Sequence, residues 1–383
     1  MSATTEKGAD TSTDDDATSV GVAVFRAILS DAALVTDLMA LTPAASPTSE
    51  DDGGDTDGSD LFSILRAEIG WSEMFHRGGA VPRLVCMQGA VTEHLFGGEE
   101  KWTNEPLYRH PADEQPLMST WTPTVARIRD RVNEVLSNRS GKEVAVNHAL
   151  IQLYRGGNDY ISEHADKTID VRRGSDIVSV SFGATRQFVL RPKRNNSAAS
   201  GAAAAAAAAT RPGDGGDGGE GAATATKEKA ADETKPRAPR PKTRVDLPDD
   251  SMVILGWETN KNYLHAIRKD KRQLSLKRHD ELIHDGERIS LTFRTIDTFC
   301  ARKIEDGGGG VAKAKATSHS GYQYVWGQGA RSKTSKEARE AMWYSTRSAA
   351  EAEVEDSQLL YAFHNENSNA AFDWDANYGR GFH

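Results

Sequence analysis

The chain has 383 residues, of which 38% are hydrophobic and 27% charged, with 34 glycines and a net charge of −9. The apolar share is below that of an average globular domain, so we expect one folded core and a sizeable disordered fraction. A helical membrane span is excluded because no apolar run approaches about 18 residues, and the acidic, polar start predicts no secretory signal. Two cysteines cannot build a disulfide framework, which favours a reducing compartment.

Helices are predicted at three places near the start of the chain and before its first strands. Residues 1–59 are polar and mostly disordered by composition, with a helix expected within 20–41. A second amphipathic helix is predicted at Leu61–Ile69. The strongest helix signal is Trp121–Leu136, where a Thr-Pro pair supplies a capping residue and a favoured first-turn residue.

Strand signals begin after this third helix and are interrupted once. Short apolar or alternating runs bounded by turn residues predict strands at Val146–Tyr154, Ile177–Phe182, Phe188–Leu190, Met252–Leu255 and Ile289–Phe293. Residues 192–247 are of low complexity, with an alanine run followed by Gly, Asp, Lys, Pro and Arg. Because strands lie on both sides of it, this segment is predicted to be an insertion inside one domain.

The most informative residues are His164 and Asp166, which form a His-x-Asp pattern. Residues two apart in extended backbone point to the same side, so both could bind one metal ion. The best candidate for a third ligand is His265 on a distant predicted strand. Two histidines and one carboxylate leave three coordination positions open, which suits a non-heme Fe(II) ion that activates oxygen.

A second signal lies on the predicted strand Arg288–Arg294. Its alternation places Arg288, Ser290, Thr292 and Arg294 on one face. Arginines on the inward face of a strand require an anionic partner, and a bidentate carboxylate is the natural one. The alternative is an exposed edge strand whose arginines lie in water.

These residues stand in a series of motifs that resembles the AlkB family of Fe(II)- and 2-oxoglutarate-dependent dioxygenases, most closely its eukaryotic DNA-repair branch. The resemblance covers roughly residues 81–297 without the insertion. It rests, in chain order, on Val81-Pro82-Arg83, Trp121 with Arg127 to Asp130, the His164 and Asp166 segment, Ser179 to Ala184 with Arg186 and Phe188, His265, and Arg288 to Arg294.

The resemblance implies a fold and a set of site residues. The fold is a double-stranded β-helix (jelly-roll) core, mainly β with flanking helices, in which His164, Asp166 and His265 bind Fe(II). 2-Oxoglutarate and O2 are the implied co-substrates. The residues implied for 2-oxoglutarate binding are Arg288, Arg294, Tyr154, Gln152 and Ser290. At the last two positions the family usually has asparagine, so the reach of the side chains differs and a shifted co-substrate affinity or preference is an open alternative.

The family oxidises an N-alkyl carbon, after which an aldehyde is lost, so a target base must leave its stack and enter the site. By position, Tyr108, His110 and Arg186 are predicted to bind this substrate. Lys271 and Arg272 lie in a basic run after His265 and are predicted to contact phosphates, with a solvated charged face as the alternative.

We therefore predict an oxidative demethylase of N-alkylated bases in DNA or, less favoured, RNA, acting as a monomer without a membrane partner. A basic, Pro-rich run at 235–244 favours the nucleus, and the cytoplasm is the alternative. The predicted catalytic domain is 60–300, and 301–383 is a polar extension whose aromatic residues are expected to dock on the core. Two rival functions are the same chemistry on a protein, lipid or small molecule, and a catalytically silent nucleic-acid-binding or scaffold protein.

Overall fold

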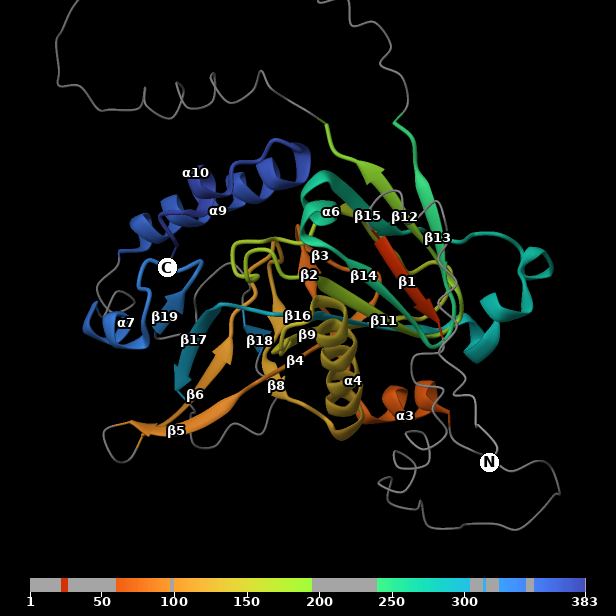
Figure 1. Ribbon diagram of the computed structural model, residues 1–383, viewed down its shortest axis with the longest axis horizontal. Coiled ribbons are helices and arrows are strands. Elements are labelled where there is room, and N and C mark those ends of the chain that lie inside the picture. Colours follow the sequence, from red (N-terminus) through yellow and green to blue (C-terminus); the bar gives the residue numbers. More distant parts are fainter. Residues whose placement is uncertain are drawn as a thin grey trace, which may run out of the picture.

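The computed structural model of the chain describes residues 22–26, 60–96, 100–194, 240–303, 313–314, 324–341 and 348–382. Two sheets form the centre of this part of the chain, with helices α3 (Leu61–Glu68) and α4 (Pro123–Ser140) beside the larger sheet (Figure 1). Helices α9 (Ala349–Ser368) and α10 (Trp374–Tyr378) lie on the other side of Figure 1, at the upper left.

The larger sheet has the strand order β1-β14-β11-β16-β9-β4-β8. Its strands are Val22–Arg26 (β1), Ser251–Leu255 (β14), Ile177–Gly183 (β11), Arg288–Arg294 (β16), His148–Tyr154 (β9), Leu84–Gly89 (β4) and Met118–Thr120 (β8). The smaller sheet has the order β10-β15-β12-β13, with strands Ile161–His164, Tyr263–Ile267, Arg186–Pro192 and Thr243–Leu247. The mainly β, jelly-roll class predicted from the sequence is confirmed.

Alternation along strand β16 separates two environments. Ile289, Leu291 and Phe293 are fully buried in a cluster with residues of α3 and α4. The intervening residues, which include Arg288 and Arg294, line a cavity on the opposite face of the same sheet. A second apolar cluster joins the larger sheet to the smaller one; for example, it includes Val253 of β14 and Phe188 of β12. The strand period of two therefore places the arginines between the sheets.

A third sheet, in the order β19-β17-β6-β5, carries part of the C-terminal region. Its strands are Tyr324–Gly327, Thr298–Lys303, Glu100–Pro106 and Thr92–Phe96. The smaller elements are β2 (Phe75–His76), β3 (Gly79–Ala80), β7 (Gln115–Pro116), α6 (Trp257–Asn262), η1 (Leu274–Leu276), η2 (His279–Glu281), η3 (Ile283–Gly286), β18 (Lys313–Ala314) and α7 (Ser335–Ala341). No helix in the described ranges is both long and apolar enough to cross a membrane.

The helices predicted at Leu61–Ile69 and Trp121–Leu136 correspond to α3 and α4. Thr122 is the N-cap of α4, although its side chain makes no capping hydrogen bond, and a proline begins the helix. Strands are present within all five predicted stretches.

Two predictions from the sequence are wrong within the described residues. In place of the helix expected within 20–41, residues Val22–Arg26 form β1, which pairs with β14. A short run with β-branched residues fits both periods, and pairing with the edge of a sheet decides between them. The insertion predicted at 192–247 is shorter, because Thr243–Leu247 forms β13, in which Val245 and Leu247 are buried. Residues 195–239, like the rest of 1–59, lie outside the described residues.

Candidate metal centre

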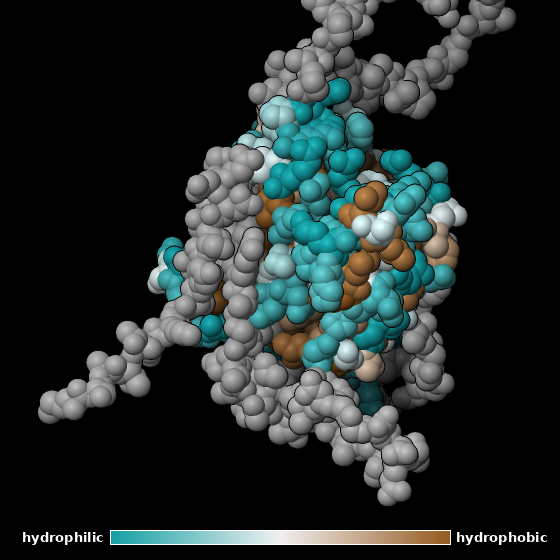
Figure 2. All heavy atoms as spheres, turned by 90° about the vertical axis from the view of Figure 1, so that its right-hand side faces the viewer, coloured by the Kyte–Doolittle hydropathy of each residue, from teal (hydrophilic) through white to brown (hydrophobic). Residues whose placement is uncertain are grey.

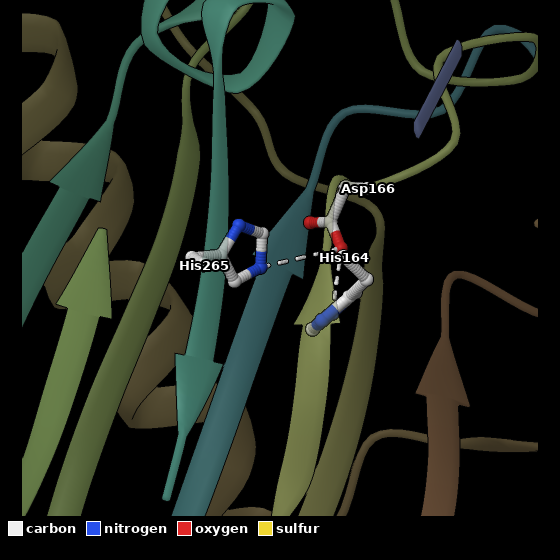
Figure 3. A group of neighbouring side chains, drawn as sticks. All are labelled: His164, Asp166 and His265. Atoms are coloured by element: carbon white, nitrogen blue, oxygen red, sulfur yellow. Dashed lines mark ion pairs between the residues drawn. The ribbon is translucent and has the colours of Figure 1, made fainter. Parts of the chain in front are cut away.

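Three side chains that can bind a metal ion meet at one end of the smaller sheet. His164 ends β10, Asp166 follows two residues later, and His265 lies opposite His164 on the neighbouring β15. The Nε2 atoms of both histidines lie 4.0 Å from Oδ1 of Asp166. Figure 3 shows the three side chains turned toward one another. Candidate ligand atoms from all three lie within 4.8 Å of one another, so one ion could contact all of them.

The hydrogen bonds of His164 and Asp166 leave free the lone pairs that a metal ion would need. Nδ1 of His164 lies 2.8 Å from the carbonyl oxygen of Ser162, to which it can donate its proton. This interaction fixes the tautomer whose Nε2 carries a lone pair. Nε and Nη2 of Arg294 donate to Oδ2 of Asp166 at 3.3 and 3.0 Å, so Oδ1 remains directed at the histidines.

The surroundings hold the three groups in the protonation states that bind metals. Burial lowers the pKa of His164 to about 3 and that of His265 to about 4, so both rings are neutral at pH 7. Burial alone would raise the pKa of Asp166, but the charge of Arg294 and its hydrogen bonds to this carboxylate outweigh burial and hold that pKa below its usual value. Two neutral imidazoles and an ionised carboxylate are a ligand set ready for a divalent cation.

The segment after His164 is fixed by a residue that the sequence did not single out. The amide of Asp166 donates to Oδ1 of Asn260 at 2.9 Å, and Nδ2 of Asn260 donates to the carbonyl oxygen of Asp166 at 3.0 Å. Asn260 lies in α6, five residues before His265, and is almost fully buried. In the sequence, Asn260 is marked only by its place shortly before His265, the third proposed ligand.

A cavity of about 570 Å³ extends from these three residues to Arg288. The Arg288 side chain is among the most deeply buried in the described part of the chain, with 1% exposed. One of its nitrogens, Nη2, donates to the hydroxyl oxygens of Ser181 at 2.7 Å and Ser290 at 3.3 Å. Nε and Nη1 have no acceptor among the described residues.

Burial lowers the pKa of Arg288 to about 10, so the guanidinium keeps its charge at neutral pH. A buried cation with two unsatisfied donors is costly unless an anion pairs with it. The donors of a guanidinium are spaced to bind both oxygens of a carboxylate. The residues present therefore fit a small carboxylic acid bound inside the cavity.

The other residues predicted for 2-oxoglutarate binding surround Arg288. Its guanidinium carbon lies 5.3 Å from the centre of the Tyr154 ring, and the Tyr154 hydroxyl donates to Oε1 of Gln152 at 3.0 Å. Gln152 and Ser290 are direct cross-strand partners on β9 and β16. The two departures from the usual family pattern therefore lie side by side, with a longer side chain opposite a shorter one.

Of the three residues predicted to bind substrate, two lie at the cavity. Tyr108 and His110 line the cavity and stack with ring centroids 5.3 Å apart. Tyr108 is buried beneath Arg294, whose guanidinium carbon lies 4.2 Å from the ring centre. Both ring nitrogens of His110 lack a partner among the described residues, and burial lowers its pKa to about 4.

Arg186 does not line the cavity. Its guanidinium donates to the carbonyl oxygens of Gly156, Asp159 and Arg268, which ties two loops together. These contacts do not favour the predicted role in substrate binding, which stays a prediction.

The two residues predicted to contact phosphates lie in the loop between β15 and β16. Arg272 is paired with Asp270 at 2.9 Å and with Glu281 at 2.7 Å, whereas Lys271 is exposed. This loop, teal at the right of Figure 1, is on the side that faces the viewer in Figure 2, where the described surface is mostly hydrophilic with scattered hydrophobic areas. Lys271 is therefore the better placed of the two for an external phosphate.

Comparisons with known proteins agree with this geometry. Residues 55–294 match the family model described as the 2OG-Fe(II) oxygenase superfamily. DNA oxidative demethylase ALKBH2 of Bos taurus is 44% identical over 150 residues, which cover 37% of this chain and 46% of the bovine protein. The Arabidopsis thaliana protein of the same name is 24% identical over 244 residues, or 62% of this chain and 61% of that protein.

The chain spans about half the length of the curated relatives that it matches. A solved structure of OsALKBH1 aligns with 72% of this chain and 98% of its own, at 12% identity and a TM-score of 0.34.

Proposed function

The chain belongs to the 2OG-Fe(II) oxygenase superfamily, and from this membership we propose that it is an oxidative demethylase of N-alkylated bases in DNA. Membership implies Fe(II), 2-oxoglutarate and O2 as cofactor and co-substrates. The observation that carries the proposal is the pairing, in one cavity, of a two-histidine, one-carboxylate cluster with the buried, unsatisfied guanidinium of Arg288.

In the proposed mechanism, His164, Asp166 and His265 would hold Fe(II), which together with 2-oxoglutarate and the oxidant O2 would supply the oxidation of an alkyl carbon. Arg288 binds the distal carboxylate of 2-oxoglutarate through the donors that lack an acceptor. Arg294 keeps Asp166 ionised and turned toward the histidines. Asp166, Arg288 and Arg294 are buried, and each of these interactions is stronger there than it would be in water.

The proposed substrate enters beside the metal ligands, where Tyr108 and His110 line the same cavity. His110, whose ring stacks on Tyr108 and is only partly buried, offers a flat neutral face that suits a base. DNA is favoured over RNA because the matched relatives are named DNA oxidative demethylase. With DNA as substrate, we further propose that the protein acts as a monomer in the nucleus.

The test is demethylation of oligonucleotides that carry 1-methyladenine or 3-methylcytosine, as single-stranded DNA, double-stranded DNA and RNA. Purified protein is supplied with Fe(II), 2-oxoglutarate and ascorbate, and mass spectrometry measures the loss of one methyl group. His164→Ala is the control for the metal, and Arg288→Ala is the control for the co-substrate. We expect methyl loss from DNA with the unaltered chain, none with His164→Ala, and methyl loss with Arg288→Ala only at a much higher concentration of 2-oxoglutarate.

The other outcomes separate the rival functions. Consumption of 2-oxoglutarate without methyl loss would keep the oxygenase and move the search to a protein, lipid or small-molecule substrate. Binding of the oligonucleotide with no consumption of 2-oxoglutarate would favour a silent nucleic-acid-binding protein.

A further inference from the structure

The metal ligand Asp166 lies in an irregular segment, Ala165–Thr168, that has neither helical nor strand structure. The segment is buried, so its amide groups cannot all turn to water. Buried backbone N–H groups outside regular structure must find acceptors elsewhere. Which groups accept these hydrogen bonds therefore determines where Asp166 is held.

All four successive amides of the segment donate to side chains from distant parts of the chain. The inner two, of Asp166 and Lys167, donate to Asn260 at 2.9 Å and to the Tyr108 hydroxyl at 3.3 Å. The outer two bonds come from one place, the end of helix α9. The amide of Ala165 donates to Oδ1 of Asn367 at 3.0 Å, and that of Thr168 donates to Oε1 of Glu366 at 3.0 Å.

Lys167 strengthens this attachment. Its Nζ donates to the carbonyl oxygen of Ala165 at 3.0 Å and to Oδ1 of Asn367 at 2.5 Å, and it lies 3.9 Å from Oε2 of Glu366. Both Lys167 and Glu366 are almost fully buried, with 2% and 3% exposed. Removing either side of such a buried pair is strongly unfavourable, so the helix end and the ligand segment are held together as one unit.

The rest of the C-terminal region packs behind the same segment. Ile169 is fully buried in a cluster with Leu359, Phe363 and Tyr378. The Trp374 indole also donates to the carbonyl oxygen of Thr168 at 3.2 Å. The apolar contacts fix the helix against the core, and the polar contacts at its end reach the ligand segment.

From these contacts we infer that Asn367 and Glu366 are positioning residues of the metal centre, contributed by a helix outside the part of the chain that matches the family model. That match ends at residue 294. Asn367 also lines the cavity beside His164 and Asp166, so the C-terminal helix supplies part of the wall next to the ligands. The inference rests on the proposed metal site, and it adds to that site an element from beyond the residues that match the family model.

The test measures Mn(II) binding to the full chain by isothermal titration calorimetry, with Mn(II) as the only added ligand. The temperature is kept well below the unfolding midpoint of each variant. Asn367→Ala removes the acceptor for Ala165 and Lys167, and we expect it to weaken Mn(II) binding about tenfold, as changes around metal ligands commonly do. Asn367→Asp keeps an oxygen at this position and is expected to restore most of the affinity. Ser368→Ala is the matched control, because its hydroxyl bonds only carbonyl oxygens of its own helix.

The outcomes are distinct. Unchanged Mn(II) affinity in Asn367→Ala, with the unaltered chain binding well, would overturn the inference and leave the metal site intact. Absence of Mn(II) binding in the unaltered chain would overturn the metal site and the inference together. If Asn367→Ala does not fold, Asn367→Gln retains the amide but displaces its oxygen by one methylene, and the same loss of affinity is expected; wild-type affinity in that variant would count against the inference.

Discussion

Residues of strand β16 and of the segment Ala165–Thr168 line the same cavity, but the two elements hold their functional side chains in different ways. On β16, backbone pairing with β9 and β11 fixes every second side chain toward the cavity. In Ala165–Thr168 the backbone pairs with side chains drawn from four distant residues. A sheet places residues through its register, whereas an irregular segment is only as well placed as the side chains that accept its hydrogen bonds.

The largest expected effect comes from Asp166→Asn in the irregular segment. The substitution removes a proposed metal ligand and leaves Arg294 without its carboxylate, and both side chains of that pair are at least 95% buried. An uncompensated buried charge lowers the free energy of unfolding by about 3–5 kcal/mol. Urea unfolding of the metal-free protein measures this loss, and Mn(II) titration measures the loss of binding. A stability equal to that of the unaltered chain would show that the Arg294 contact contributes little.

On the strand, Arg288→Met should have the opposite effect on stability. It removes a buried charge with two unsatisfied donors, so the metal-free protein should become more stable. At the same time, losing a charged bidentate contact of about 1.5–3 kcal/mol should raise the KM for 2-oxoglutarate by roughly 10- to 150-fold. A thermal melt and a 2-oxoglutarate turnover assay measure the two effects. Lower stability with an unchanged KM would contradict the proposed anion site.

The difference between a strand and an irregular segment also determines which site residues could be predicted from the sequence. The period-two pattern of Arg288–Arg294 was enough to place both arginines on the cavity face, because a strand transmits sequence spacing directly into geometry. His164 and Asp166 were identified from the His-x-Asp pattern together with the motifs around it, although Asp166 lies outside a strand. Asn260 and Asn367 could not be found this way, because their roles depend on which distant segments the fold brings together.

Strands β5 and β6 were missed for a related reason. Strands β5 and β6 carry polar residues such as Glu100 and Asn104, and their sequence does not alternate clearly. Pairing with β17, which tertiary structure supplies, makes β6 a strand. The error at 22–26 is similar, because pairing with β14 decided the outcome there.

A smaller effect is expected from Asn260→Ala, which leaves two backbone groups of Asp166 without partners. Each unsatisfied buried group costs about 1–3 kcal/mol, so unfolding should become easier by at least the lower value. Asn262→Ala is the matched control, because its amide bonds only Glu258 within the same short helix. Urea unfolding compares the two variants. Equal effects would mean that Asn260 acts through the helix and not through Asp166.

Within the sheet, Gln152 and Ser290 offer a test of register. Because they are cross-strand partners, Ser290→Asn alone should crowd Gln152, and overpacking of this kind costs about 1–3 kcal/mol. Gln152→Asn with Ser290→Asn should recover part of that loss and produce a coupling energy of at least about 0.5 kcal/mol. Urea unfolding of Gln152→Asn, Ser290→Asn and the double variant gives the changes in unfolding free energy from which the coupling energy is calculated. Additive effects would show that the two departures from the family pattern are independent.

The smallest effect is expected at the surface, where neither the sheet nor the segment is altered. Lys271→Glu should weaken binding to a methylated oligonucleotide and lower the salt slope of binding by about one, as the loss of one phosphate contact does. Arg272→Glu is a poorer probe, because it also breaks pairs with Asp270 and Glu281 that stabilise the loop. Fluorescence anisotropy at several salt concentrations measures the slope. If Lys271→Glu leaves the slope unchanged, the loop between β15 and β16 does not follow the phosphate backbone, and the DNA must approach the cavity from another side.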